Sequence, residues 1–103
     1  MTTSLSFTPA AEIDLAAIFV WYAEQRDGLG GRFIDAADEL FRRIRESPRL
    51  FPEVVAGYRR GLLHRFPYGV YFSLEPNRVV VHAVLHLHRD PAVWRERLSR
   101  GSG

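Results

Sequence analysis

Hydrophobic residues recur with two different periods along the chain, and the change of period separates a helical first half from a stranded second half. Up to residue 46, apolar positions recur every three or four residues, as on one face of an α-helix. From Tyr58 onward, short runs of aromatic and β-branched residues are separated by turns that contain Pro or Gly, which is typical of β-strands. The pattern predicts an α+β fold.

A first helix is expected to follow a short strand at residues 5–7. Thr8 fits an N-cap, with Pro9 at the first helical position. One apolar stripe of this helix, at i, i+3, i+4 and i+7, consists of Ile13, Ala16, Ala17 and Val20. Much of the remaining circumference is occupied by Leu15, Ile18, Phe19 and Tyr22. A helix that is apolar this far round must be covered on more than one side, by the sheet and by a second helix or a partner.

A second helix should run antiparallel to the first. Residues 26–31 contain three glycines and break the first helix. The apolar stripe of the second helix consists of Phe33, Ala37, Leu40, Phe41 and Ile44. Ser47 and Pro48 end it, because the residue before a proline disfavours the α region. The short connection predicts an antiparallel helical hairpin.

Three meandering strands are expected in the second half, after a loop at residues 48–57. The apolar anchors of this loop are expected to be Leu50, Phe51, Val54 and Val55. Residues 58–66 and 70–75 read as the two strands of a β-hairpin. Three arginines of this hairpin, Arg59, Arg60 and Arg65, are not required by a purely structural strand. On the Arg59 and Arg65 side of its first strand, two guanidinium groups could bind a phosphate.

The last strand is expected at residues 78–87, with a short helix after it that begins at Pro91 and carries Trp94. Its odd positions, from Val79 to Leu87, should form one continuous apolar face. Its even positions form a mixed face that includes three histidines, His82, His86 and His88. The expected architecture is an N-terminal strand, a helical hairpin on one face of a largely antiparallel sheet, and a short C-terminal helix.

Composition predicts a single domain over residues 1–103, because the chain is long enough for only one core. There is no cysteine, which removes disulfides and thiolate metal sites and makes the cytoplasm the default location. The N-terminus lacks the pattern of a signal peptide, and no apolar run is long enough to span a membrane. We expect a cytoplasmic protein with no membrane partner.

Charge is distributed unevenly, although the net charge is only +2. All 14 basic residues are arginines, and none is lysine. Residues 1–46 are acidic on balance, whereas residues 47–103 are basic, which suggests an acidic or nucleic-acid partner for the second half.

Motifs for metal, phosphate or nucleophilic chemistry are weak. Three histidines alternate on one predicted strand, but they lack supporting Cys, Asp or Glu ligands, so they read as polar residues of an exposed face. No glycine-rich phosphate loop follows a strand, and no serine lies in a nucleophile elbow. An acid-base site that combines arginines with His86 or His88 is possible. Trp94 could stack on a base, but is more often a packing anchor.

Several segments together resemble the RelE/ParE superfamily of type II toxins, closest to its ParE-like branch. They are residues 11–15 followed by Trp21-Tyr22, residues 47–54, residues 59–68 and residues 86–94. The resemblance implies a small α+β toxin that a cognate antitoxin neutralises by wrapping around it. Antitoxin contacts are expected at Leu15, Phe19, Tyr22, Arg59 and Arg60.

Two activities follow from the two branches of this superfamily. The ParE-like branch implies inhibition of DNA gyrase by binding, without catalysis, and places target contacts at Arg65, His86, Arg89 and Trp94. The alternative, the RelE-like branch, implies a ribosome-dependent mRNA endonuclease that would use Arg65, His88 and Trp94. The absence of lysine, with His88 where an arginine is expected, favours the binding toxin. No cofactor and no metal are expected in either case.

Overall fold

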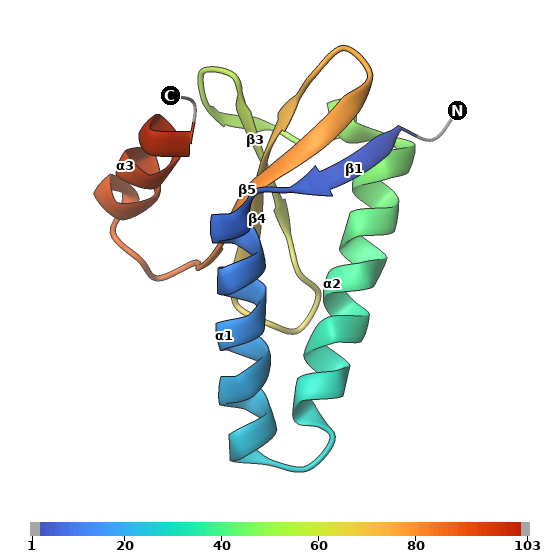
Figure 1. Cartoon of the computed structure of the whole chain (residues 1–103), viewed down its shortest axis with the longest axis vertical. Helices are drawn as coiled ribbons and strands as arrows, with labels where there is room; N and C mark the ends of the chain where they lie inside the picture. Colours follow the sequence, from blue (N-terminus) through green and yellow to red (C-terminus); the bar gives the residue numbers. More distant parts are fainter. Residues whose placement is uncertain (1–2, 102–103) are drawn as a thin grey trace.

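A five-stranded mixed sheet forms the centre of the computed structural model, which describes residues 3–101 (Figure 1). The chain order is β1 (Ser4–Phe7), α1 (Pro9–Gln25), α2 (Leu29–Glu46), a 3-10 turn (Pro48–Leu50), β2 (Glu53–Val55), β3 (Tyr58–Leu62), β4 (Tyr68–Leu74), β5 (Arg78–His86) and α3 (Pro91–Gly101). The strand order is β1-β5-β4-β3-β2, with β1 parallel to β5 and the other pairs antiparallel. The predicted α+β class is confirmed.

The strand β2 was not predicted. The segment expected to be a loop pairs with β3 at the edge of the sheet, through Glu53 with Arg59 and Val55 with Tyr58. Leu50 is 82% exposed, so its prediction as an apolar anchor is wrong. It lies in the 3-10 turn that precedes the edge strand, and no residue of this turn is buried.

The first helix begins as predicted. The Thr8 hydroxyl oxygen accepts the backbone N–H of Ala11 at 3.1 Å, and Pro9 is the first helical residue. The side of α1 that packs into the core consists of Ala11, Leu15, Ile18 and Tyr22. The stripe from Ile13 to Val20 therefore faces away from the sheet.

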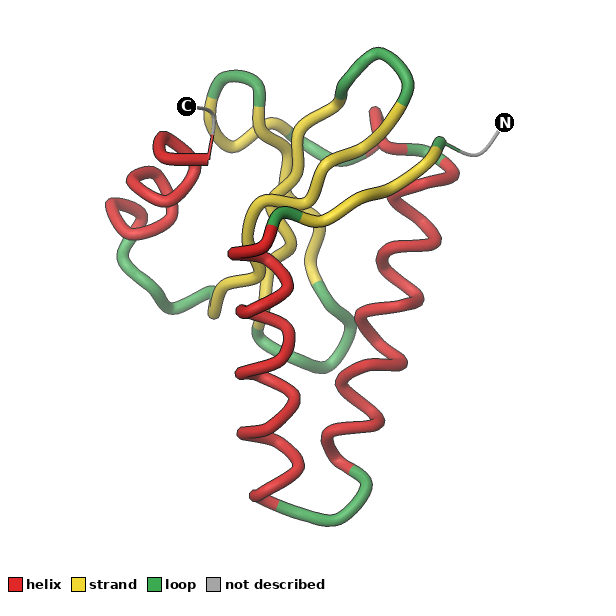
Figure 2. The backbone as a smooth tube through the Cα atoms, in the orientation of Figure 1, coloured by secondary structure: helices red, strands yellow, loops and turns green. Residues whose placement is uncertain are grey.

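The second helix packs its predicted stripe against α1 and the sheet, and all five residues of that stripe are buried. Gly28 precedes α2 with a φ of +82°, a conformation that favours glycine. Gly30 lies where the two helices approach closely, since a Cβ built there would be 3.0 Å from the Phe19 ring and 3.1 Å from the Ala23 Cβ. The hairpin then extends beyond the sheet, as the tube in Figure 2 shows.

A β-bulge at His82 reverses the faces of β5. Tyr71 of β4 pairs with Ala83, whereas the next residue, Phe72, pairs with Val81, so His82 is an extra residue on β5. The β5 residues that face the core under the α1–α2 helical hairpin are Val79, Val81 and Val84. Those that face α3, on the other side of the sheet, are Ala83 and Leu85. The prediction of one continuous apolar face is wrong, because an inserted residue shifts the alternation by one.

The second face of the sheet carries a smaller core under α3. Its buried residues are Tyr71, Ala83, Leu85, Trp94 and Leu98. The Trp94 ring stacks on the Tyr71 ring, with centroids 5.5 Å apart and an interplanar angle of 24°. The Tyr58 hydroxyl donates to the Leu98 carbonyl at 3.2 Å. Side-chain packing and the hydrogen bond from Tyr58 therefore attach α3 to the sheet.

Candidate interaction surfaces

Arg65 lies in a tight connection between β3 and β4 that is attached to the end of β5. The Leu63 N–H donates to the Tyr68 carbonyl at 3.0 Å, and the Leu87 N–H donates to the Pro67 carbonyl at 2.9 Å. Arg65 has a φ of +68° and is the only non-glycine residue with a positive φ in the described part of the chain. A left-handed arginine is uncommon and is kept only where the surrounding structure imposes it. We call residues 63–67 the Arg65 turn.

An aromatic cluster holds the Arg65 turn against the helical hairpin. The Phe66 ring meets the Tyr22 ring edge-on at 5.0 Å and the Phe33 ring at 5.6 Å. Tyr68 also packs edge-on against both of these rings. Burial is the main cause that raises the pKa of Tyr22, and Tyr68 raises it further, so the Tyr22 hydroxyl stays protonated. The Arg65 turn therefore packs on an uncharged cluster of aromatic rings.

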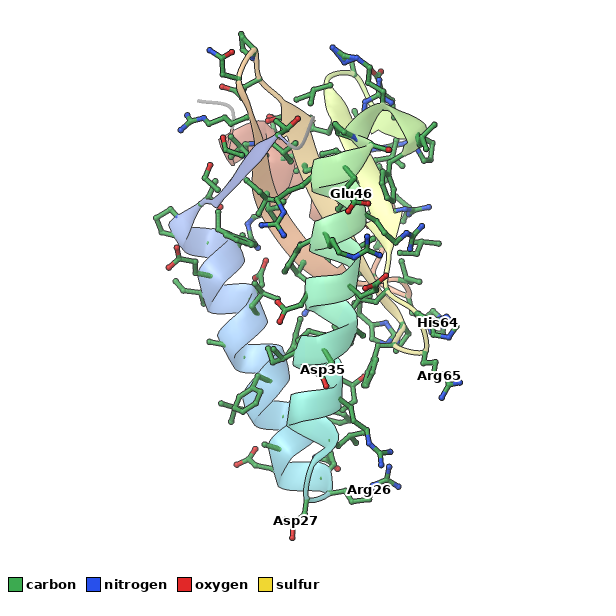
Figure 3. All side chains as sticks on the ribbon, turned by 90° about the vertical axis from the view of Figure 1, so that its right-hand side faces the viewer. Arg26, Asp27, Asp35, Glu46, His64 and Arg65 are labelled. Carbon is green, nitrogen blue, oxygen red and sulfur yellow. The ribbon has the colours of Figure 1, made fainter. Side chains whose placement is uncertain are left out.

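A groove of about 600 Å3 runs between the Arg65 turn and α2. Its apolar residues are Tyr22, Leu29, Ala36, Leu40 and Phe66. Its charged and polar residues are Arg32, Asp35, Glu39, Arg43, His64 and Arg65. Figure 3 shows His64 and Arg65 pointing outward from the turn, on the side where Asp35 lies on α2. The groove suits a segment that has both apolar and acidic groups.

The Arg59 side chain binds other parts of the same chain. Its Nη1 donates to the carbonyl oxygens of Phe51 at 2.6 Å and Arg49 at 3.3 Å, and its Nη2 lies 3.9 Å from Glu53. These contacts hold the 3-10 turn and β2 against β3. Because β3 ends at Leu62, strand alternation does not extend to Arg65, and the expected phosphate clamp of Arg59 with Arg65 is not formed.

Arg60 points to the opposite face of β3 from Arg59. It pairs with Tyr71, and its side-chain carbons lie over Gly69, where a Cβ would be 3.0 Å away. Its side chain is half-buried. Antitoxin contacts by Arg59 and Arg60 stay predictions.

The three histidines expected on one face of the last strand do not share a face, and His88 lies beyond the end of β5. His82 hydrogen-bonds Ser73 Oγ at 2.8 Å and meets the Tyr58 ring, whereas the His86 ring meets the Tyr68 ring edge-on at 5.1 Å. The expectation of a single histidine face is wrong because of the bulge at His82. His88 is exposed, its ring is 5.0 Å from that of His86, and its backbone N–H donates to His86 Nδ1.

The predicted target residues therefore fall into two groups. Arg65, His86 and Arg89 lie at or near the surface, whereas Trp94 is buried. Tyr68 connects the Arg65 turn to His86, and Arg89 is exposed in the turn that follows β5. Trp94 is only 8% exposed and packs on Tyr71, as a packing anchor does. Its ring is not available for stacking on a base in this arrangement.

The predicted antitoxin residues of α1 lie mostly inward. Leu15 and Tyr22 pack against the core, and Phe19 is 39% exposed over Gly30. The most exposed large apolar residues of α1 are Ile13 and Val20, which the sequence placed on one stripe, and Trp21. The sequence offered a signal for which stripe turns outward: its central residues are the small Ala16 and Ala17, which bury little apolar area.

The family model described as "ParE toxin of type II toxin-antitoxin system, parDE" matches residues 5–91. The chain belongs to the ParE toxin family. A solved structure titled "Chromosomal ParDE TA system from P. aeruginosa" has the same fold, with a TM-score of 0.72 and 21% identity. The match covers 84% of this chain and 98% of that one. None of the curated proteins compared with this chain matches it in sequence.

Within residues 3–101, no group of three or more His, Asp or Glu side chains is placed to hold a metal ion. No helix in the same range combines the length and the apolar character that crossing a membrane requires.

Proposed function

We propose that this ParE-family protein is a growth-inhibiting toxin, that it acts by binding DNA gyrase, and that a cognate antitoxin neutralises it. The family match over residues 5–91 supports the toxin role. The proposed target surface consists of Arg65, His86 and Arg89, around the Arg65 turn and the end of β5. Trp94 would contribute indirectly, by anchoring α3 to the sheet through its packing on Tyr71.

The observation that carries a binding mode of action is the conformation of Arg65. Its side chain is exposed at the rim of the groove, and the only hydrogen bond that it makes to the described residues is with the neighbouring His64 side chain, at 3.3 Å. The left-handed backbone costs free energy, and the aromatic cluster beneath it keeps the turn in place. An arginine presented in this way suits a carboxylate or phosphate on a large partner.

The endonuclease alternative has less support. A nuclease of the RelE type would present a C-terminal aromatic side chain to RNA, whereas Trp94 is buried between α3 and the sheet. The sequence also lacks the lysines of such a basic site. We therefore propose that the protein has no catalytic activity of its own.

Expression and two target assays test this proposal. Induced expression of the full chain should arrest bacterial growth, and co-expression of its antitoxin should restore growth. Purified protein should inhibit gyrase supercoiling and leave mRNA intact on translating ribosomes. Unhindered growth with folded protein in the cells would refute the toxin role, and ribosome-dependent mRNA cleavage with normal supercoiling would establish the nuclease instead.

A further inference from the structure

The groove between α2 and the Arg65 turn has an apolar lining that is already in place without a ligand. Its volume of about 600 Å3 lies within the range of sites that hold small molecules, about 300–1,000 Å3. The Tyr22 and Phe66 rings line it and contact each other edge-on, with centroids 5.0 Å apart. Leu40 also lines it and is only 1% exposed. We call Tyr22, Leu40 and Phe66 the groove floor.

One face of α2 forms a side of this groove and leaves its centre open. Four of the α2 residues that line the groove, at positions i, i+4, i+7 and i+11, are Arg32, Ala36, Glu39 and Arg43. Ala36 is the smallest of the four, so the space between the two arginines is not filled by a side chain of its own. Arg65 and His64 line the groove from the turn and point outward in Figure 3.

Positive charge exceeds negative charge around the groove. Apart from His64, the charged residues that line it are Arg32, Arg43, Arg65, Asp35 and Glu39. None of the three arginines forms an ion pair with an acid of the described residues. Glu39, in contrast, is paired with Arg42, which does not line the groove. Unpaired guanidinium groups beside an apolar lining favour an anion.

We propose that the groove is a binding site for a small apolar acid, a molecule with an aromatic or aliphatic body and one carboxylate, sulfonate or phosphate group. The body would cover the groove floor, and the acid group would accept hydrogen bonds from Arg65 and from the arginines of α2. The inference goes beyond the proposed function and does not depend on it. If both hold, the bound acid would engage Arg65 and compete with the target.

The size and charge of the groove favour such a molecule over a larger occupant. A helix with its side chains is about 10–12 Å across, so a helix of a partner would cover the groove from outside rather than fill it. A second copy of the chain would bring its own surplus of arginines to the site. A small acid matches both the volume and the sign of the charge.

Two fluorescent probes that differ by one sulfonate group test the proposal. Anilinonaphthalene sulfonate carries the acid group, and phenylnaphthylamine has the same rings without it. The full-length protein should bind the sulfonate about tenfold more tightly at low salt, which is the effect of a charge-assisted hydrogen bond. Equal affinity for the two probes would overturn the proposal.

Charge variants show whether the sulfonate lies in the groove. Arg32→Gln and Arg65→Gln should each weaken binding of the sulfonate about tenfold and leave the neutral probe unaffected. Arg78→Gln is the matched control, because Arg78 is exposed and does not line the groove. It should bind both probes as the wild type does. An equal loss in Arg78→Gln, or no loss in either groove variant, would overturn the proposal.

Amide NMR shifts of the wild-type protein give a readout that needs no variant. Saturating sulfonate should shift the signals of Leu29, Ala36 and His64, which line the groove. Shifts confined to Gly57 and Val80, which line a different hollow, would overturn the proposal. So would a dimer that the sulfonate dissociates, which would assign the groove to a second copy. The same holds if neither probe binds but a short peptide with Asp and Phe does, because the groove would then belong to a partner segment.

These measurements are independent of gyrase and of bacterial growth. Failure to arrest growth would refute the proposed function and leave the ligand site standing. Failure of the probe experiments would remove the ligand site and leave the toxin role untouched.

Discussion

Asp14 and Arg97 form an ion pair of 2.7 Å across 83 positions of sequence, and it joins α1 to α3. The same oxygen, Asp14 Oδ2, accepts the backbone N–H of Val84 at 2.9 Å, two residues beyond the bulge at His82. One carboxylate on the first helix thus fixes the last strand and the last helix together. Both side chains are largely buried, with exposed fractions of 15% for Asp14 and 25% for Arg97.

Substitution of Asp14 should cost more stability than substitution of Arg97. Asp14→Ala leaves both the Val84 N–H and the Arg97 guanidinium without their acceptor, so we expect a loss of about 2–4 kcal/mol in the free energy of unfolding. Arg97→Ala leaves Asp14 still bound to Val84 and should cost about 1–2 kcal/mol. Urea denaturation measures both values.

The exposed Arg42 provides the control for this comparison. It pairs with Glu39 and Glu46 on the surface of α2, where water screens the charges. Arg42→Ala should therefore hardly move the urea midpoint. Equal losses for Asp14→Ala and Arg97→Ala would mean that the bond to Val84 contributes nothing.

His82 should make the protein less stable as the pH falls. Burial is the main cause that lowers the pKa of His82 in the folded protein, and Glu75 opposes it. The unfolded chain, in which a histidine has a pKa of about 6.5, therefore binds more protons than the folded chain. The contribution of neutral His82 is present above that pKa and is lost as the pH falls through the folded-state value. His82→Gln should show a flatter loss of stability between about pH 7 and pH 5, by at most one proton.

Two neighbours of His82 reveal the cause of this pH dependence. Glu75→Gln removes the charge that opposes the shift and should make the dependence steeper. Ser73→Ala removes the hydrogen bond of 2.8 Å but leaves the burial, and should keep most of the dependence. If Ser73→Ala abolishes it, the hydrogen bond and not burial sets the pKa.

Local patterns were sufficient to predict the helices, because their signals lie within a few residues. The Thr8 cap and the buried stripe of α2 are examples. The bulge at His82 could not be read in this way, since it is defined by pairing with Tyr71 and Phe72 on another strand. As a result, the sequence pattern assigned the β5 residues beyond His82 to the wrong face of the sheet.

The candidate surfaces were predicted less completely than the fold. Arg65 and Arg89 are exposed as a binding role requires, but Arg59 is engaged with the backbone of a segment eight residues away. No sequence pattern distinguishes an arginine that binds its own chain from one that binds a partner. The sequence placed Ile13, Ala16, Ala17 and Val20 on one stripe of α1, and the structure assigned this stripe to the side that faces away from the sheet.

Two neighbouring glycines of α2 should respond in opposite directions to alanine. At Gly31 a Cβ would meet nothing within 4 Å, so Gly31→Ala should stabilise the helix by about 0.5–1 kcal/mol. At Gly30 the same atom would press on Ala23 and on the Phe19 ring, so Gly30→Ala should lose that gain and destabilise by about 1 kcal/mol. Thermal unfolding of the two variants gives the comparison, and stabilisation by both would show that α1 and α2 can move apart at no cost.

Arg65→Gly should make the protein more stable and a weaker toxin. Glycine adopts a φ of +68° without the strain that an arginine carries, and the Arg65 side chain is exposed, with a hydrogen bond to the neighbouring His64. We expect a gain of about 0.5–1 kcal/mol in the free energy of unfolding. Loss of a charge-assisted contact to the target should raise the concentration for half-inhibition of gyrase about tenfold or more.

Gly57→Ala is the matched control for Arg65→Gly, because Gly57 also has a positive φ, +84°, and lies in the turn between β2 and β3. It should cost about 1 kcal/mol of stability and leave inhibition unchanged. Together the two variants separate backbone strain from the function of the side chain. An Arg65→Gly protein that inhibits gyrase as the wild type does would remove Arg65 from the proposed target surface, and the half-buried His86 and the exposed Arg89 would then have to carry the interaction alone.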